Sequence, residues 1–338
     1  MSRMRPLPRP RLARTTLPDR RATWLRTAVL LAVGLAALTG LILAVKPLRL
    51  FAVLRQVSPA ELLTMLPVAL GIYIFRGLGW WVALRRIGVR LSPLRATWAL
   101  FAGKPLVFVP LGDLGRVAVL EAMGVEGHDA GELVGTVAFQ ELTYLTLMGL
   151  AMLPGISVVP QIGAVVAVLL PIQLIIFVIL FYRPAFERAV TLAEHAGLLR
   201  RYDAELRHIR GSFIRLFNGP TLAATVFLNG ISVLLAFVLF EQALHAVRVT
   251  GVGFLQAAMI YSLGFILSGF TFLPGNLGAY EGILTFFTSL QGVAPTSATA
   301  AALLYRGFND LLVAGIGIGL WLPIRRMRKR RRERRAWR

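Results

Sequence analysis

Long runs without a charged side chain dominate this sequence, and they restrict it to folds that cross a membrane. About 20 helical residues span the roughly 30 Å hydrocarbon core of a bilayer. Hydrophobic residues make up 57% of the 338-residue chain, above the roughly 45–50% of soluble domains, so a single soluble domain is excluded. Uncharged runs that can span a bilayer recur along the chain: Thr27–Val45, Leu142–Tyr182, Leu216–Phe240, Val249–Tyr280 and Gly282–Tyr305.

The spanning elements are expected to be helices. Strands that cross a membrane alternate apolar and polar residues, and these runs do not. We therefore predict an all-α, polytopic helix bundle. Its six expected spans are Thr27–Val45, Glu61–Leu84, Asp129–Leu153, Pro160–Tyr182, Thr221–Ala243 and Thr296–Pro323.

Two regions between these spans, Leu91–Gly124 and Gly251–Gly292, are interrupted by proline and glycine. Proline removes a backbone donor and glycine permits φ values that other residues resist, so a helix breaks there. A break at membrane depth is tolerated only where protein or a water-filled cavity covers it. We predict two broken or re-entrant hairpins, and the length of Gly251–Leu273 leaves the depth of the second one open. The predicted breaks are Pro110, Gly112, Gly115, Pro274, Gly275 and Gly278.

The two broken regions also look like copies of one another. The segment PLGDLG begins 164 residues before PGNLG, and one Gly-Val pair precedes another by 168 residues. A span with a charged residue near its middle follows each region: Glu141 in the first and Arg306 in the second. This pattern indicates an internal duplication.

The distribution of positive charge predicts the orientation. Lys and Arg concentrate in cytoplasmic loops, and 29 of the 37 basic residues lie on one side if each broken region enters and leaves by the same face. That topology places both termini in the cytoplasm and opens the two regions on opposite faces, as in an inverted repeat. The predicted parts are a basic tail (1–26), a membrane domain (27–323) with repeats at about 59–182 and 216–323, and a second basic tail (324–338).

The polar linker between the repeats, Arg183–Arg215, carries one apolar helical stripe. We expect it to lie on the cytoplasmic membrane interface, with packing against a partner helix as the alternative. The stripe consists of Leu199, Tyr202, Leu206, Ile209, Phe213 and Leu216.

Nine ionisable residues fall within the membrane domain away from its loops. An ionisable side chain at the centre of a bilayer costs a few kcal/mol, so each is expected to face a partner, a cavity or a substrate. The bases are Arg76, Lys104, Arg116 and Arg306, and the acids are Asp113, Glu121, Glu141, Glu281 and Asp310. With four bases and five acids, the set does not indicate which head-group charge is selected.

The candidate substrate or transport residues come from this set. Glu281, in the first turn after a break, either accepts the free backbone donors or forms an ion pair or proton site with Arg306. Arg306 is then a substrate-binding or switching residue, or half of a static salt bridge. Arg116 lies at a helix start, where the macrodipole disfavours a cation, so we expect Asp113 or a lipid phosphate to offset it.

The remaining candidates are Glu141 and Asp310, which lie inward on their spans as ion-pair partners or proton acceptors. For Arg76, snorkelling toward the membrane surface is the alternative to a role in the site.

Other functions have little support. The chain has no cysteine, and its four histidines lack ligand spacing, so we expect neither a metal site nor another cofactor. It has no GxxxxGK[ST] loop and no GxSxG elbow, so ATP-driven transport and serine hydrolysis are not expected. The terminal arginine clusters abut spans, which favours contact with the anionic cytoplasmic leaflet over nucleic acid.

The segments PLGDLGRVAVLEAMG, PGNLGAYEG and AALLYRGFNDLL resemble the transmembrane region of the lysylphosphatidylglycerol synthases, or multiple peptide resistance factors, and of stand-alone flippase-like proteins. The resemblance covers about Pro59 to Pro323. It implies translocation of lipid head groups across the bacterial inner membrane, with the same breaks and with Arg116, Glu281 and Arg306. The chain departs from the family pattern at Gln140-Glu141, where members often have an acid followed by arginine.

We expect a flippase that moves phospholipid, aminoacyl-lipid or polyprenyl-phosphate head groups and is not an enzyme. The chain carries no sequence that matches the family's aminoacyl-transferring domain. Two alternatives stay open: a non-catalytic membrane partner of a lipid-modifying enzyme, and a lipid-phosphate transferase. The transferase would need an acidic metal motif such as DxD in a cytoplasmic loop, and none is present.

Overall fold

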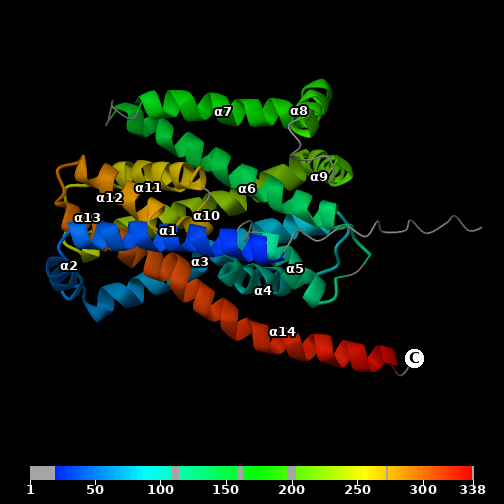
Figure 1. The fold of residues 1–338 in the computed structure, drawn as a ribbon, viewed down its shortest axis with the longest axis horizontal. Coiled ribbons are helices and arrows are strands. Elements are labelled where there is room, and N and C mark those ends of the chain that lie inside the picture. The colour runs from blue at the N-terminus through cyan, green and yellow to red at the C-terminus, as the bar shows by residue number, and fades with distance from the viewer. Residues whose placement is uncertain are drawn as a thin grey trace, which may run out of the picture.

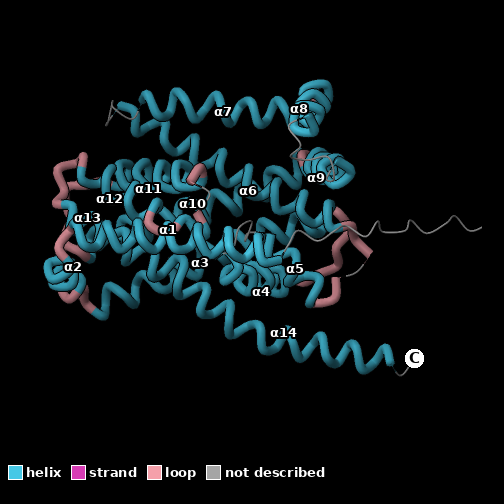
Figure 2. The backbone as a smooth tube through the Cα atoms, in the orientation of Figure 1, coloured by secondary structure: helices cyan, strands magenta, loops and turns pink. Residues whose placement is uncertain are grey.

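The computed structural model describes residues 20–108, 114–125, 127–157, 163–195, 203–271 and 273–336, and every regular element within these ranges is a helix (Figure 2). The all-α fold is thus confirmed. The predicted breaks Pro110 and Gly112, the candidate Asp113 and most of the basic N-terminal tail lie outside the described residues. So do the side chains of residues 325–338.

Six stretches of helix are long and apolar enough to cross a membrane, and they coincide with the six predicted spans. Each is bounded within a few residues of the prediction because hydropathy and the flanking proline, glycine and charged residues define its ends. The six are Thr27–Ala44 in α1 (Arg20–Ala44), α3 (Pro59–Arg86), α6 (Ala130–Met152), α7 (Gly163–Phe181), α10 (Gly219–Ala246) and Pro295–Ile324, which joins α13 (Pro295–Arg306) to α14 (Val313–Ala336).

The centre of the bundle is the pair α3 and α10, each of 28 residues. Ser58 caps α3 in a capping box with Glu61, and Asn218 caps α10, so both helices start at a defined residue. Where they cross, the Ser232 hydroxyl donates to the Ile72 carbonyl over 2.9 Å. This pair forms the support on which the broken regions are placed.

The first broken region consists of α4 (Pro93–Gly103), a 3₁₀ turn (Lys104–Phe108) and α5 (Gly115–Ala122). Helix α4 ends just before Pro105, which cannot continue it. Gly115 starts α5 against this turn, since a Cβ there would lie 2.6 Å from the Leu106 side chain. Glycine at this position therefore allows the two arms of the region to approach closely.

The second broken region consists of α11 (Phe254–Gly269), a 3₁₀ turn (Pro274–Asn276) and α12 (Ala279–Ser289). Gly275 and Gly278 have φ of 59° and 77°, which favours glycine at both positions. With 16 residues, α11 is shorter than a full span. The region is therefore a hairpin of short helices, and its depth in the membrane stays a prediction.

The two broken regions lie toward opposite ends of the bundle (Figure 1). Helices α4 and α5 lie near the end that carries α8 (Arg183–His195), α9 (Asp203–Leu216) and the end of α14. Helices α11 and α12 lie near the end that carries α2 (Pro47–Leu54). A long helix, a broken region and a second long helix follow one another twice, and the inverted relation between the two sets stays a prediction.

The linker differs from the expectation in what its apolar stripe contacts. Phe213 and Leu216 of α9 are buried against Phe139 and Leu142 of α6, so this part of the stripe binds the protein and not the membrane interface. The close approach depends on Gly135, because a Cβ there would lie 2.6 Å from the Ser212 side chain. Leu199 and Tyr202 lie outside the described residues.

Candidate functional site

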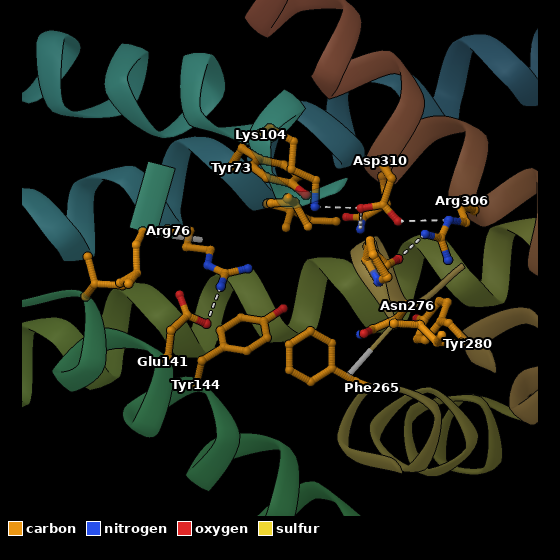
Figure 3. Close-up of a pocket in the computed structure, with 18 of the residues that line it drawn as sticks. Tyr73, Arg76, Lys104, Glu141, Tyr144, Phe265, Asn276, Tyr280, Arg306 and Asp310 are labelled. Atoms are coloured by element: carbon orange, nitrogen blue, oxygen red, sulfur yellow. Dashed lines mark hydrogen bonds and ion pairs between the residues drawn. The ribbon is translucent and has the colours of Figure 1, made fainter. Parts of the chain in front are cut away.

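A cavity of about 650 Å³ lies in the middle of the bundle, between the two broken regions (Figure 3). Its walls come from α3 and α6, the 3₁₀ turns of both regions, α11, α12 and the last span. Its polar lining includes three bases, Arg76, Lys104 and Arg306, and two acids, Glu141 and Asp310. The cavity therefore brings together five of the nine charged residues that the sequence placed within the membrane.

On the side of the first region, one carboxylate serves two guanidinium groups. Glu141 on α6 lies 2.5 Å from Arg76 and 2.6 Å from Arg116. The Gln140 side chain accepts a further bond from Arg116, at 2.6 Å, and donates to the backbone carbonyl of Arg76. Neighbouring residues of α6 thus join α3 to the start of α5.

The two arginines of this network also lie over aromatic rings. The Arg76 guanidinium is 4.6 Å from the ring centre of Tyr144, and that of Arg116 is 4.9 Å from Trp80. Trp80 is fixed by donating its indole N–H to Thr136 over 2.8 Å. Cation–π contact adds to the ion pairs in holding these charges away from water.

On the side of the second region, Glu281 is fully buried at the start of α12. It accepts from the Gly278 N–H over 2.9 Å and lies 2.9 Å from Arg306 on α13. Arg306 also donates to the Gly275 carbonyl, so it satisfies part of the backbone that the break exposes. Both roles that the sequence left open for Glu281, acceptor for the backbone and partner of Arg306, are present in this geometry.

Asp310 connects the second network to the first broken region. Its carboxylate lies 3.5 Å from Arg306 and 2.6 Å from Lys104, which belongs to the 3₁₀ turn after α4 (Figure 3). Asp310 sits in a π-helical turn, Gly307–Leu312, inside the last span. Such a widened turn re-aims a side chain and is frequent at functional sites.

The structure shows partners for both arginines of the first network. Arg116 is offset by Glu141 and Gln140, and Asp113 lies outside the described residues. Snorkelling is wrong for Arg76, whose side chain is only 11% exposed because α6 supplies Glu141 beside it. Glu121, which the sequence grouped with the membrane acids, is exposed on α5 and does not line the cavity.

Sequence reasoning missed several residues of the site. Lys104 was counted as a membrane cation but had no assigned role. The polar aromatic wall, Tyr73, Tyr144, Tyr261 and Tyr280, was not recognised at all. A lysine directly before a proline inside a broken region was the available signal for Lys104. The tyrosines lie on separate helices, and nothing in their spacing distinguishes them from core residues.

The charged network carries one more base than acid. Among the described residues it contains four cations, Arg76, Lys104, Arg116 and Arg306, and three carboxylates, Glu141, Glu281 and Asp310. Each cavity base lies near both a carboxylate and a tyrosine ring; Lys104 is 5.2 Å from Tyr73, and Arg306 is 5.9 Å from Tyr280. Each cavity base is therefore held in place by a carboxylate and an aromatic ring.

Two comparisons with known proteins bear on the family. Residues 24–335 match the model of the lysylphosphatidylglycerol synthase transmembrane region. A UPF0104 membrane protein of Methanothermobacter thermautotrophicus is 23% identical over 327 aligned residues, which cover 86% of this chain and 93% of that relative. The matched range includes both broken regions and every charged residue of the cavity, so this chain is a membrane protein that belongs to the family of the lysylphosphatidylglycerol synthase transmembrane region.

Proposed function

We propose that the protein moves lipids between the two leaflets of the membrane and binds the phosphate of the head group in its central cavity. The observation that carries this proposal is the cavity itself, which places three bases between two broken regions inside the hydrophobic bundle. Buried charges of this kind mark the path of a polar substrate through a membrane protein. Broken helices that meet near the midplane are typical of alternating-access transporters.

The basic side chains, and not the helix start of the second region, are the proposed phosphate ligands. The Gly278 N–H at the start of α12 already donates to Glu281, which occupies that anion position. Arg76 and Lys104 line the cavity with side chains only 11% and 14% exposed. A phosphate between them would accept charge-assisted hydrogen bonds from α3 and from the first broken region at once.

The proposed setting is the cytoplasmic membrane, a bacterial inner membrane if the family resemblance applies, with both termini in the cytoplasm. The first residues of α1, the helices α8 and α9 and the end of α14 lie at the same end of the bundle (Figure 1). The sequence places most basic residues at that end, so we propose that the terminal clusters contact anionic lipid there. The lipid gradient, the membrane potential or protons would drive transport, without chemical change of the lipid.

Proteoliposomes that contain the purified protein test this function. The readout is movement of labelled anionic phospholipid, aminoacyl-lipid or polyprenyl-phosphate between leaflets. We expect Arg76→Gln and Lys104→Gln each to slow transport at least 10-fold. Arg248→Gln is the matched control, because Arg248 forms an exposed ion pair with Glu61, 2.8 Å away, outside the cavity.

The alternative outcome is equally specific. If folded, correctly inserted wild-type protein moves none of these lipids, transport by this chain alone is wrong. The chain would then be examined as a non-catalytic partner of a lipid-modifying enzyme, by measuring whether that enzyme's lipid product moves only when both proteins are present.

A further inference from the structure

We infer that the cavity opens sideways to the bilayer between α1 and α6, and that its apolar wall there holds a hydrocarbon chain of the substrate. This wall, called here the chain wall, consists of Leu30, Leu114, Val134, Val137 and Ala138. The inference rests on the proposed function and adds the route by which the lipid enters the cavity. The guest is a lipid whose chains stay in the membrane, and not a free phosphate that enters from water.

Along one face of α6, the residues that line the cavity change from apolar to charged. Val134, Val137, Ala138, Glu141 and Tyr144 recur every three or four residues, so they lie along one side of the helix, and all five line the cavity. The first three are apolar, and the last two belong to the charged network. A guest aligned with α6 would thus meet hydrocarbon at one end and cations at the other, which is the polarity of a phospholipid.

Helix α1 forms the other side of the proposed opening. Leu30 of α1 lines the same cavity as Val137 and Ala138 of α6. The main packing of α1, however, is against α2, α12 and the 3₁₀ turn Pro274–Asn276, all outside α6. A Cβ on Gly34 would lie 3.1 Å from Leu277, and one on Gly278 would lie 2.7 Å from Ala37, so α1 is attached closely to the second region.

This attachment leaves the side of α1 toward α6 without extensive helix packing. Val134 and Ala138 are partly exposed where they line the cavity. In a bilayer, hydrocarbon chains cover such surfaces. The same hydrocarbon is then continuous from the bilayer to the chain wall, and a lipid can keep its chains in it while its head group reaches Arg76.

Reversible cross-linking tests the opening. The chain has no cysteine, so Leu30→Cys with Ala138→Cys introduces the only two thiols. We expect joining them with short, cleavable bifunctional reagents to slow lipid transport at least 10-fold, and reduction of the reagent to restore it. The two single-cysteine proteins, treated identically, are the matched controls. Recovery on reduction excludes misfolding as the cause of the loss.

Two probes distinguish a lipid from a soluble phosphate. Glycerol 3-phosphate carries the phosphate without chains, and we expect it to raise the melting temperature of the cross-linked and open proteins equally. A phospholipid with a photoreactive group in its chain is expected to label residues 134–138 in the open protein only. Equal labelling of both forms, or labelling confined to α7, would overturn the inference.

The inference and the proposed function fail in different ways. If wild-type protein moves no lipid, the function fails and the cross-link is uninformative for transport, but the labelling result still decides the chain wall. If wild-type protein moves lipid and the cross-linked protein moves it at the same rate, the function stands and the lateral opening is wrong.

Discussion

Each broken region has an ion pair between a helix start and the helix that follows, and the charges of the two pairs are arranged in opposite ways. In the first, a cation at a helix start, Arg116, pairs with an acid on the following long helix, Glu141. In the second, an acid at a helix start, Glu281, pairs with a cation on the following helix, Arg306. The two partners are 25 residues apart in each case. The equal spacing with opposite charges indicates that each break needs an ion pair more than it needs a particular sign.

The two ion pairs differ in how many arginines bind the carboxylate and in how deeply that carboxylate is buried. Glu281 is fully buried, and its ion pair is with Arg306. Glu141 is 23% exposed and is shared by Arg76 and Arg116. The second pair follows the macrodipole, since an acid at a helix start is favourable, whereas the first opposes it. We therefore expect the second pair to be structural and the first to be available to a substrate.

The largest expected effect is the loss of Arg306. Arg306→Ala leaves Glu281 buried without its cation, and removing one partner of a buried pair costs about 3–5 kcal/mol. Arg116→Ala leaves Glu141 with Arg76, so we expect a smaller loss of about 1.5–3 kcal/mol, the value of a hydrogen bond to a charged group. Reversible unfolding in detergent measures both. Equal losses would contradict the proposed division between a structural and a substrate-binding pair.

A charge exchange within the second region sharpens the comparison. If each break needs an ion pair of either sign, Glu281→Arg combined with Arg306→Glu recovers part of the stability that each single substitution loses. Contacting charges have coupling energies of up to about 3 kcal/mol, and we expect about 2 kcal/mol here. If the double variant loses as much unfolding free energy as the two single variants together, the sign of the charge at the start of α12 is fixed by the macrodipole.

The sequence predicted the spans and the second pair because their signals are local. Hydropathy defines each span, and Pro274, Gly275 and Gly278 interrupt the helix whatever tertiary contacts surround them. Glu281 and Arg306 follow as the charged residues nearest this break. In contrast, Lys104 and Asp310 are 206 residues apart and belong to the first broken region and the last span, so their contact depends on tertiary packing. The linker stripe had a similar ambiguity, because an apolar helical face does not indicate whether lipid or α6 covers it.

A smaller effect tests the backbone of the second region. Gly278→Ala adds a Cβ at φ 77°, 2.7 Å from Ala37 and from the Gly34 carbonyl oxygen. We expect a loss of about 1–3 kcal/mol, the cost of a residue held in a sparsely populated conformation. Gly282→Ala is the matched control, since a Cβ there meets nothing within 4 Å. Melting temperatures measure both, and a neutral Gly278→Ala would contradict the close docking of α1 on this turn.

The smallest expected effect concerns the starts of the helices that carry Glu141 and Arg306. Asp129 caps α6 by accepting from the Gly131 N–H over 3.0 Å, whereas Ala294 precedes α13 without a side-chain cap. The Gly131 N–H, with a further contribution from His208, holds the pKa of Asp129 below its ordinary value. Ionised Asp129 thus stabilises the fold above its unfolded pKa of about 4, and this stabilisation is lost as pH falls through the lower folded pKa.

The pH dependence is measured as the difference in melting temperature between wild type and Asp129→Asn. We expect this difference to be present at pH 7 and to disappear on acidification below about pH 4, because both proteins then carry an uncharged cap. Ala294→Asp supplies the missing cap to α13 and is expected to stabilise the protein by about 0.5–1 kcal/mol at pH 7. It should introduce a second loss of stability in the same acidic range. A stabilisation that does not change with pH would mean that the new side chain caps α13 without a contribution from its charge. The starts of α6 and α13 would then differ in more than the identity of the cap residue.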